Sequence, residues 1–272
     1  MANKTALKIF LLLCVQIPAV VKAYAQQINP AGKNIAERFV PPPGYVRVNY
    51  AENSFQQYLR LYPLKKYNSP VLLYNGETKK NAVHVSVFAM PLLNTDLIQC
   101  ADALIKLRAE YLYREKRFSD IVFTITNGES VPFKKYSEGY RPVISSNKVV
   151  WKDGGKKGSS RDVFDEYLKF IYIYAGTLSL ARQAKNINLN QIRVGDFFIY
   201  GGSPGHVVMV LDLAEDIETG KKIMLLGQSY MPSQEFHVLK SFETISPWYY
   251  VRDGDLITPE WHFGTTGLMS FE

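Results

Sequence analysis

Cysteine is the scarcest chemically reactive residue in this chain of 272 residues, which contains only Cys14 and Cys100, and histidine is nearly as rare with four residues. Zinc sites built from several thiolates are therefore excluded. If Cys14 is lost with an N-terminal targeting segment, an internal disulfide is excluded as well. Cys100 then remains as a free thiol, an intermolecular bridge or a catalytic nucleophile.

Long apolar runs are also lacking outside the N-terminus. There, Lys4 and Lys8 flank the start of an apolar run over residues 9–21, and Ala23-Tyr24-Ala25 supplies a small-x-small cleavage site. This order predicts a secretory signal peptide over residues 1–25. No later segment approaches spanning length, so we expect no integral membrane segment after cleavage. The mature protein is predicted to be exported, to the periplasm or the cell exterior.

A large excess of charge of one sign is absent from the predicted mature chain, which has a mild positive excess. Cleavage removes three lysines and lowers the formal net charge from +7 to +4. The densest basic cluster, residues 152–161, is interrupted by glycine and serine, which is typical of a solvated loop. Aromatic residues do not interleave with it as they do in nucleic-acid platforms, so no nucleic-acid partner is predicted.

The chain is long enough, and with 47% hydrophobic residues apolar enough, for one well-packed domain. Residues 26–43 end in three prolines and are interpreted as a leader or linker. Residues 44–272 are predicted to form a single α+β domain with an N-terminal β extension. An insertion at about residues 128–190 is irregular at first and then contains helical segments.

The longest helix is predicted over residues 97–116, with Asn94 or Thr95 as its cap. Cys100 falls on the apolar stripe of this helix, which favours a packing role, because cysteine is a small hydrophobe. It also lies early in the helix, where the macrodipole stabilises a thiolate. Both interpretations remain open from the helix alone.

Three apolar runs, over residues 196–200, 206–212 and 222–228, predict short antiparallel strands joined by turns. His206 is the first residue of the second strand and follows a glycine-rich turn. Because side chains alternate along a strand, Gln228 has the parity to share a face with His206. The pair is interpreted either as a base with its orienting partner or as an edge histidine that bonds a loop.

Four segments together resemble the papain-like cysteine, histidine-dependent amidohydrolases and peptidases and their NlpC-type relatives. They are Gln99-Cys100-Ala101-Asp102-Ala103, Val194-Gly195-Asp196-Phe197-Phe198, Pro204-Gly205-His206-Val207-Val208-Met209-Val210 and Gly227-Gln228-Ser229. The resemblance implies a papain-like core, in which a helix carrying the cysteine packs on a small antiparallel sheet carrying the histidine. It also implies that Cys100 is the nucleophile, His206 the base, Gln228 the orienting residue and Gln99 part of the oxyanion hole. No metal or other cofactor is implied.

The whole mature chain also resembles a secreted bacterial family of unknown function. The expected function is a secreted thiol amidase or peptidase acting on cell-envelope peptide bonds, with a peptide or peptidoglycan-like substrate. The alternative is a catalytically inactive protein of the same fold that binds envelope or glycan material. The predicted start of the helix well before Cys100, the long insertion and the uncharged Gln228 favour that alternative.

Overall fold

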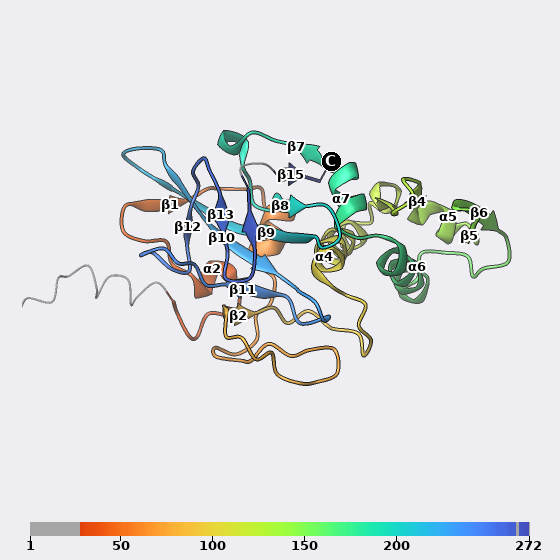
Figure 1. Ribbon diagram of the computed structural model, residues 1–272, viewed down its shortest axis with the longest axis horizontal. Coiled ribbons are helices and arrows are strands. Elements are labelled where there is room, and N and C mark those ends of the chain that lie inside the picture. Colours follow the sequence, from red (N-terminus) through yellow and green to blue (C-terminus); the bar gives the residue numbers. More distant parts are fainter. Residues whose placement is uncertain (1–27, 265–266, 272) are drawn as a thin grey trace, which may run out of the picture.

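A computed structural model describes residues 28–264 and 267–271, so the predicted signal peptide lies outside the described residues. Nine strands within the described part form one sheet, whose main path runs in the order β2-β11-β10-β9-β8-β15-β7, with β1 added to β9 and β12 to β10 (Figure 1). All of these neighbours pair antiparallel. The strands are β1 (Tyr45–Arg47), β2 (His84–Val87), β7 (Lys185–Asn186), β8 (Phe197–Tyr200), β9 (His206–Asp216), β10 (Lys222–Gln228), β11 (His237–Leu239), β12 (Tyr249–Tyr250) and β15 (Leu268–Ser270).

The hairpin of β9 and β10 forms the centre of this sheet. Its register runs from Lys222 opposite Glu215 to Gly227 opposite Met209, with an irregularity between Leu225 and Leu226. The predicted hairpin is therefore confirmed. Residues 206–214 of β9 are all buried, because helices and loops cover both faces of this strand, as its continuous apolar run requires.

Helices lie beside the sheet and in the segment between β2 and β8. They are α2 (Ile35–Arg38), α3 (Phe55–Arg60), α4 (Cys100–Arg114), α5 (Phe133–Ser137), α6 (Arg161–Tyr174) and α7 (Thr177–Gln183). Helix α4 contacts β9 on one side and α6 on the other. It thus lies between the sheet and the outer helical region (Figure 1). The structure is α+β, with a large antiparallel sheet and several helices.

The predicted insertion at about residues 128–190 makes up most of this outer region. It contains α5, α6 and α7 and one small hairpin, and it shares a second small hairpin with the segment before it. The hairpins join β3 (Val122–Thr124) to β4 (Ser130–Pro132) and β5 (Arg141–Ser145) to β6 (Lys148–Lys152). A further pair, β13 (Leu256–Ile257) with β14 (His262–Phe263), belongs to the C-terminal segment.

The N-terminal segment differs from the predicted leader. Within the described part of residues 26–43, Ile35 and Phe39 have no exposed surface and belong to the main core. Further along, Arg47 and Arg60 each place Nε 2.6 Å from the carboxylate of the buried Asp212. The segment is therefore integrated into the domain. Three successive prolines do not imply a linker when apolar residues just before them can be buried.

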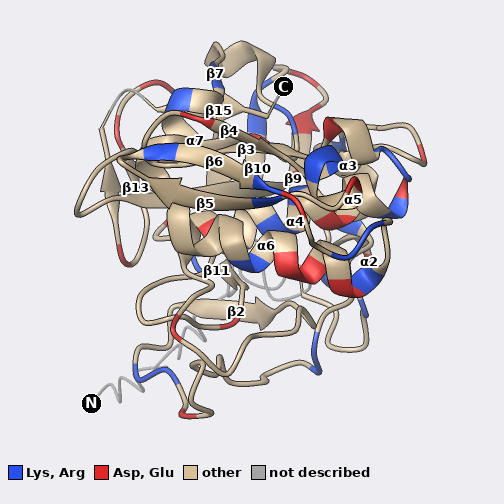
Figure 2. Ribbon diagram, turned by 90° about the vertical axis from the view of Figure 1, so that its right-hand side faces the viewer, with Lys and Arg blue, Asp and Glu red and all other residues tan. Residues whose placement is uncertain are grey.

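The surface carries mixed charge. Figure 2 shows lysine and arginine interspersed with aspartate and glutamate over the face that carries α3, α4 and α6, with no continuous basic area on it. Among the residues described, no helix is both long and apolar enough to span a bilayer.

Candidate functional site

Helix α4 begins at Cys100, and the expectation that it starts near residue 97 was wrong. Gln99 is the N-cap, with an extended backbone, and its N–H donates to Asp102 Oδ2 at 3.0 Å. Asp96 is held outside the helix, because Oδ1 accepts bonds from Ser233 N at 2.6 Å and Gln99 Nε2 at 3.1 Å. The carboxylate of Asp102, at the third helical position, thus caps the N–H of Gln99, which is one half of a capping box. Cys100 consequently lies at the first helical position of α4.

Cys100 is almost fully buried, with 6% of its surface exposed. Burial raises the pKa of its thiol to about 11, and the charge of Asp102 acts in the same direction. The backbone N–H groups of Ala101 and Val207 face the sulfur and lower the pKa, but burial outweighs them. The thiol is therefore neutral at pH 7, and the stabilisation expected from the helix N-terminus does not produce a resting thiolate.

His206 begins β9, directly before the Val207 amide that faces the thiol. Its ring is 1% exposed and packs against the rings of Tyr230, Trp261 and Phe263, with centroid distances of 4.7, 5.3 and 5.9 Å. Burial in this aromatic surrounding lowers the pKa of His206 to about 4. The imidazole is thus neutral at pH 7 and available as a proton acceptor. No hydrogen bond joins these two described side chains, Cys100 and His206.

Gln228 ends β10 and lies on the face of the hairpin predicted from its parity. Its Oε1 is 2.8 Å from His206 Nε2, so the predicted pair is brought into contact. Its Nε2 donates to Glu260 Oε2 at 2.6 Å, and Glu260 Oε1 is 2.6 Å from Lys79 Nζ. We call this row, His206–Gln228–Glu260–Lys79, the imidazole clamp.

The clamp determines the tautomer of His206. A carboxylate only accepts hydrogen bonds, so Glu260 requires the amide nitrogen of Gln228 to face it. The amide oxygen must then face His206, and Nε2 carries the imidazole proton. Nδ1 is left unprotonated and has no hydrogen-bond partner among the described residues. A neutral glutamine thus acquires its orientation from a charged pair behind it, which the sequence interpretation did not anticipate.

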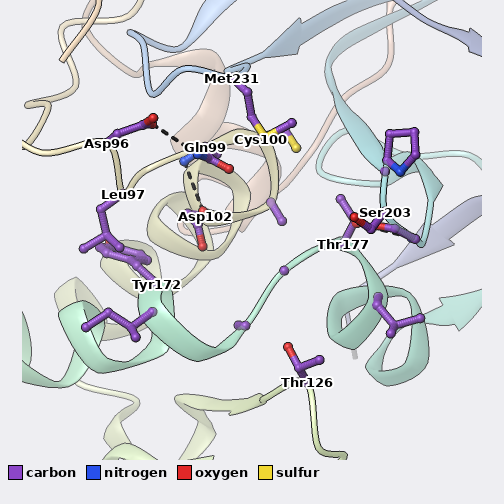
Figure 3. Close-up of a pocket in the computed structure, with 18 residues that line it drawn as sticks. Asp96, Leu97, Gln99, Cys100, Asp102, Thr126, Tyr172, Thr177, Ser203 and Met231 are labelled. Atoms are coloured by element: carbon purple, nitrogen blue, oxygen red, sulfur yellow. Dashed lines mark hydrogen bonds between the residues drawn. The ribbon is translucent and has the colours of Figure 1, made fainter. Parts of the chain in front are cut away.

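A pocket of about 550 Å³ opens beside Cys100. Its walls come from the segment before α4 and its first turn, the junction of α6 with α7, the turn between β8 and β9, and Met231 after β10. In Figure 3 the sulfur of Cys100 points toward the side of the pocket that carries Ser203. His206 does not itself line this pocket, although Gly205 does.

Gly205 allows the turn before His206 to approach α7 closely. A Cβ at this position would lie 2.2 Å from Thr177 Oγ1 and 2.6 Å from Gly202 O. Only glycine fits between these atoms without displacing the turn. The glycine-rich stretch that appears in the sequence as a simple turn signal thus has a steric role in placing His206.

Gln99, the expected oxyanion-hole residue, lines the pocket next to Cys100. One of its side-chain N–H groups is used by Asp96, at 3.1 Å. The backbone N–H of Cys100 belongs to the first turn of α4, where helical N–H groups have no intrahelical acceptor. These are the groups that could receive a developing negative charge.

Several residues of the site carried no recognisable signal in the sequence. Glu260 follows Gln228 by 32 residues, and Lys79 precedes it by about 150, so only the fold brings them together. Asp102 had one weak signal, its place three residues after Gln99. No group of three or more histidine, cysteine, aspartate or glutamate residues within the described part is arranged to hold a metal ion.

The fold and the site define an α+β protein with a helix-borne thiol, a strand-borne imidazole and an orienting amide. Residues 35–270 match the family model described as Domain of unknown function (4846), so the chain belongs to this family. Searches of curated proteins and of solved structures found no match.

Proposed function

We propose that the protein is an exported cysteine amidohydrolase or peptidase of papain-like topology that cleaves peptide bonds of cell-envelope material. The hydrogen bond between His206 Nε2 and Gln228 Oε1 carries the proposal, because it leaves Nδ1 as the basic nitrogen. A helix that begins at Cys100 and packs against β9 supports it. The export and the envelope substrate rest on the signal-like residues 1–25 and on the resemblance of the four sequence segments.

The chemistry follows from two neutral groups. As Cys100 Sγ attacks the scissile carbonyl carbon, its proton moves to His206 Nδ1, and the carbonyl oxygen becomes an oxyanion. In this proposal the backbone N–H of Cys100 and the amide of Gln99 donate to that oxygen. Collapse breaks the C–N bond, and the imidazolium protonates the leaving amine. Water then hydrolyses the thioester, with His206 accepting its proton and returning it to the sulfur.

The test of turnover uses purified peptidoglycan and soluble peptide fragments derived from it. New amino and carboxyl termini are identified by mass spectrometry after incubation with the protein. We expect cleavage that disappears in Cys100→Ala and in His206→Ala, while circular dichroism shows both variants folded. Cleavage by wild-type protein that persists in Cys100→Ala would overturn the proposal.

One observation favours the alternative, an inactive envelope- or glycan-binding protein of the same fold. Burial raises the pKa of the Cys100 thiol to about 11, so no thiolate is present at pH 7, as expected of a cysteine in a packing role. Alkylation by iodoacetamide at pH 7 separates the two. A working base accelerates alkylation, so His206→Ala slows the reaction, whereas His262→Ala, which alters an exposed histidine, leaves it unchanged. Equal rates in both variants would favour the inactive protein.

A further inference from the structure

Asp102 carries a charge that its structural role does not require. It is 6% exposed, and only Oδ2 has a partner, the N–H of Gln99 at 3.0 Å. Oδ1 is buried without a hydrogen-bond partner. An asparagine would cap α4 equally well through its carbonyl oxygen, without burying a charge. Burial raises the pKa of Asp102 to about 7, because the charged carboxylate is poorly solvated in the free protein.

Tyr172, in the last turn of α6, lines the same pocket and carries a second buried polar group without a partner. It is 7% exposed, and its hydroxyl makes no hydrogen bond among the described residues. A buried tyrosine hydroxyl normally finds a partner, and phenylalanine would fill this space without the cost. Burial raises its pKa well above the usual value, and Asp102 is the charge that adds most to this effect.

The two groups are neighbours that do not bond each other, and both line the pocket beside Cys100. In Figure 3 the carboxylate of Asp102 points into the space above the α6 segment that carries Tyr172. A ligand group with several N–H donors would satisfy both oxygens at once, which a single hydroxyl or carbonyl would not.

The charge of the pocket also favours a cation. Its lining includes the carboxylates of Asp96 and Asp102 and no lysine, arginine or histidine. Asp96 is exposed to solvent and its Oδ1 already accepts two hydrogen bonds, whereas Asp102 Oδ1 is buried and has no partner in the described part of the chain. A charge-assisted hydrogen bond to an ammonium group is the strongest contact that such an oxygen forms.

We propose that Asp102 and Tyr172 form a subsite for a protonated amino group of the substrate, next to the bond attacked by Cys100. The inference rests on the proposed function in one respect, because it gives that peptidase a preference for peptides with a free amine near the scissile bond. Binding of the amine itself does not depend on turnover, so the two proposals can fail separately.

The experiment measures binding by NMR to the Cys100→Ala variant, which holds ligands without cleaving them. Three probes distinguish the source of the amine: alanyl-alaninamide with a free α-amine, its N-acetyl form with none, and N-acetyl-alanyl-lysinamide with a side-chain amine. At least one amine-bearing probe should bind at least tenfold more tightly than the N-acetyl form. The resonances of Asp102 and Tyr172 should shift with it.

Variants assign the effect to the subsite. Asp102→Asn keeps the helix cap and should abolish the preference for the amine. Tyr172→Phe removes a hydroxyl that bonds nothing in the free protein and should reduce the preference without loss of stability. Asp96→Asn removes the same charge from the same pocket and should reduce it by less than threefold.

Equal binding of acetylated and free amines, no binding of any probe, or equal losses in Asp96→Asn and Asp102→Asn would overturn the subsite. Wild-type protein that binds the amine but never cleaves peptides would overturn the peptidase and leave the subsite standing.

Discussion

Glu260→Gln perturbs the imidazole clamp at its charged end. Glu260 uses one oxygen for the amide of Gln228 and the other for Lys79, both at 2.6 Å. Glutamine has a single acceptor oxygen, so either the amide or the ammonium group loses its partner. The side chains of Lys79 and Glu260 are each 9% exposed, which leaves little water to replace the lost bond.

The expected loss is about 3 kcal/mol in the free energy of unfolding, because one partner of a buried charged pair is removed. Urea unfolding measures it. Glu243→Gln is the matched control, since its partner Arg252 is 62% exposed, and we expect that change to cost about 0.5 kcal/mol or less. Lys79→Met on the Glu260→Gln background should recover stability, because the unpaired ammonium is then absent.

The same variant should change the tautomer of His206. Without the carboxylate, Gln228 can turn its amide nitrogen toward the ring, and the proton then moves from Nε2 to Nδ1 in part of the molecules. Nitrogen-15 NMR of the imidazole distinguishes the two forms. A pure Nε2-protonated ring in Glu260→Gln, with a stability loss no larger than that of Glu243→Gln, would refute the clamp.

Two further predictions concern stability. The folded-state pKa values of His206, about 4, and His237, about 3, lie below the ordinary value of 6.5, so the unfolded chain binds more protons below that pH. The free energy of unfolding that these two histidines contribute is therefore complete above pH 6.5 and falls as the pH drops toward 4. For His206 the expected loss is roughly 3 kcal/mol. It is measured by urea unfolding of wild type and of His206→Gln at pH 7 and at pH 4. Gly205→Ala should cost about 1–3 kcal/mol because its Cβ would overlap the turn and α7, whereas Gly264→Ala, with nothing within 4 Å, should cost far less in the same assay.

Local patterns in the sequence predicted the two strands that carry His206 and Gln228. The apolar runs predicted β9 and β10, and the period of two placed His206 and Gln228 on one face, where their side chains meet at 2.8 Å. Parity alone was not sufficient, because the register shifts by one residue between Leu225 and Leu226, and this shift places Gln228 on the face of His206.

The start of the helix that carries Cys100 depended on contacts that sequence patterns predict poorly. Propensity extends the helix back to residue 97, but Asp96 instead bonds Ser233, which comes from the loop after β10. That tertiary contact holds Asp96 outside α4, and Asp102 then caps the helix so that it starts at Cys100.

By itself the sequence determined that Cys100 is the one cysteine after residue 14, and it predicted a histidine at the start of a central strand and an amide on the adjoining one. Only the tertiary structure decided that the thiol begins its helix, that Glu260 orients the amide, and that both the thiol and the imidazole are neutral. The physical reason is that burial and pairing across long sequence separations set charge states, whereas strand parity and apolar spacing depend on neighbours in the chain.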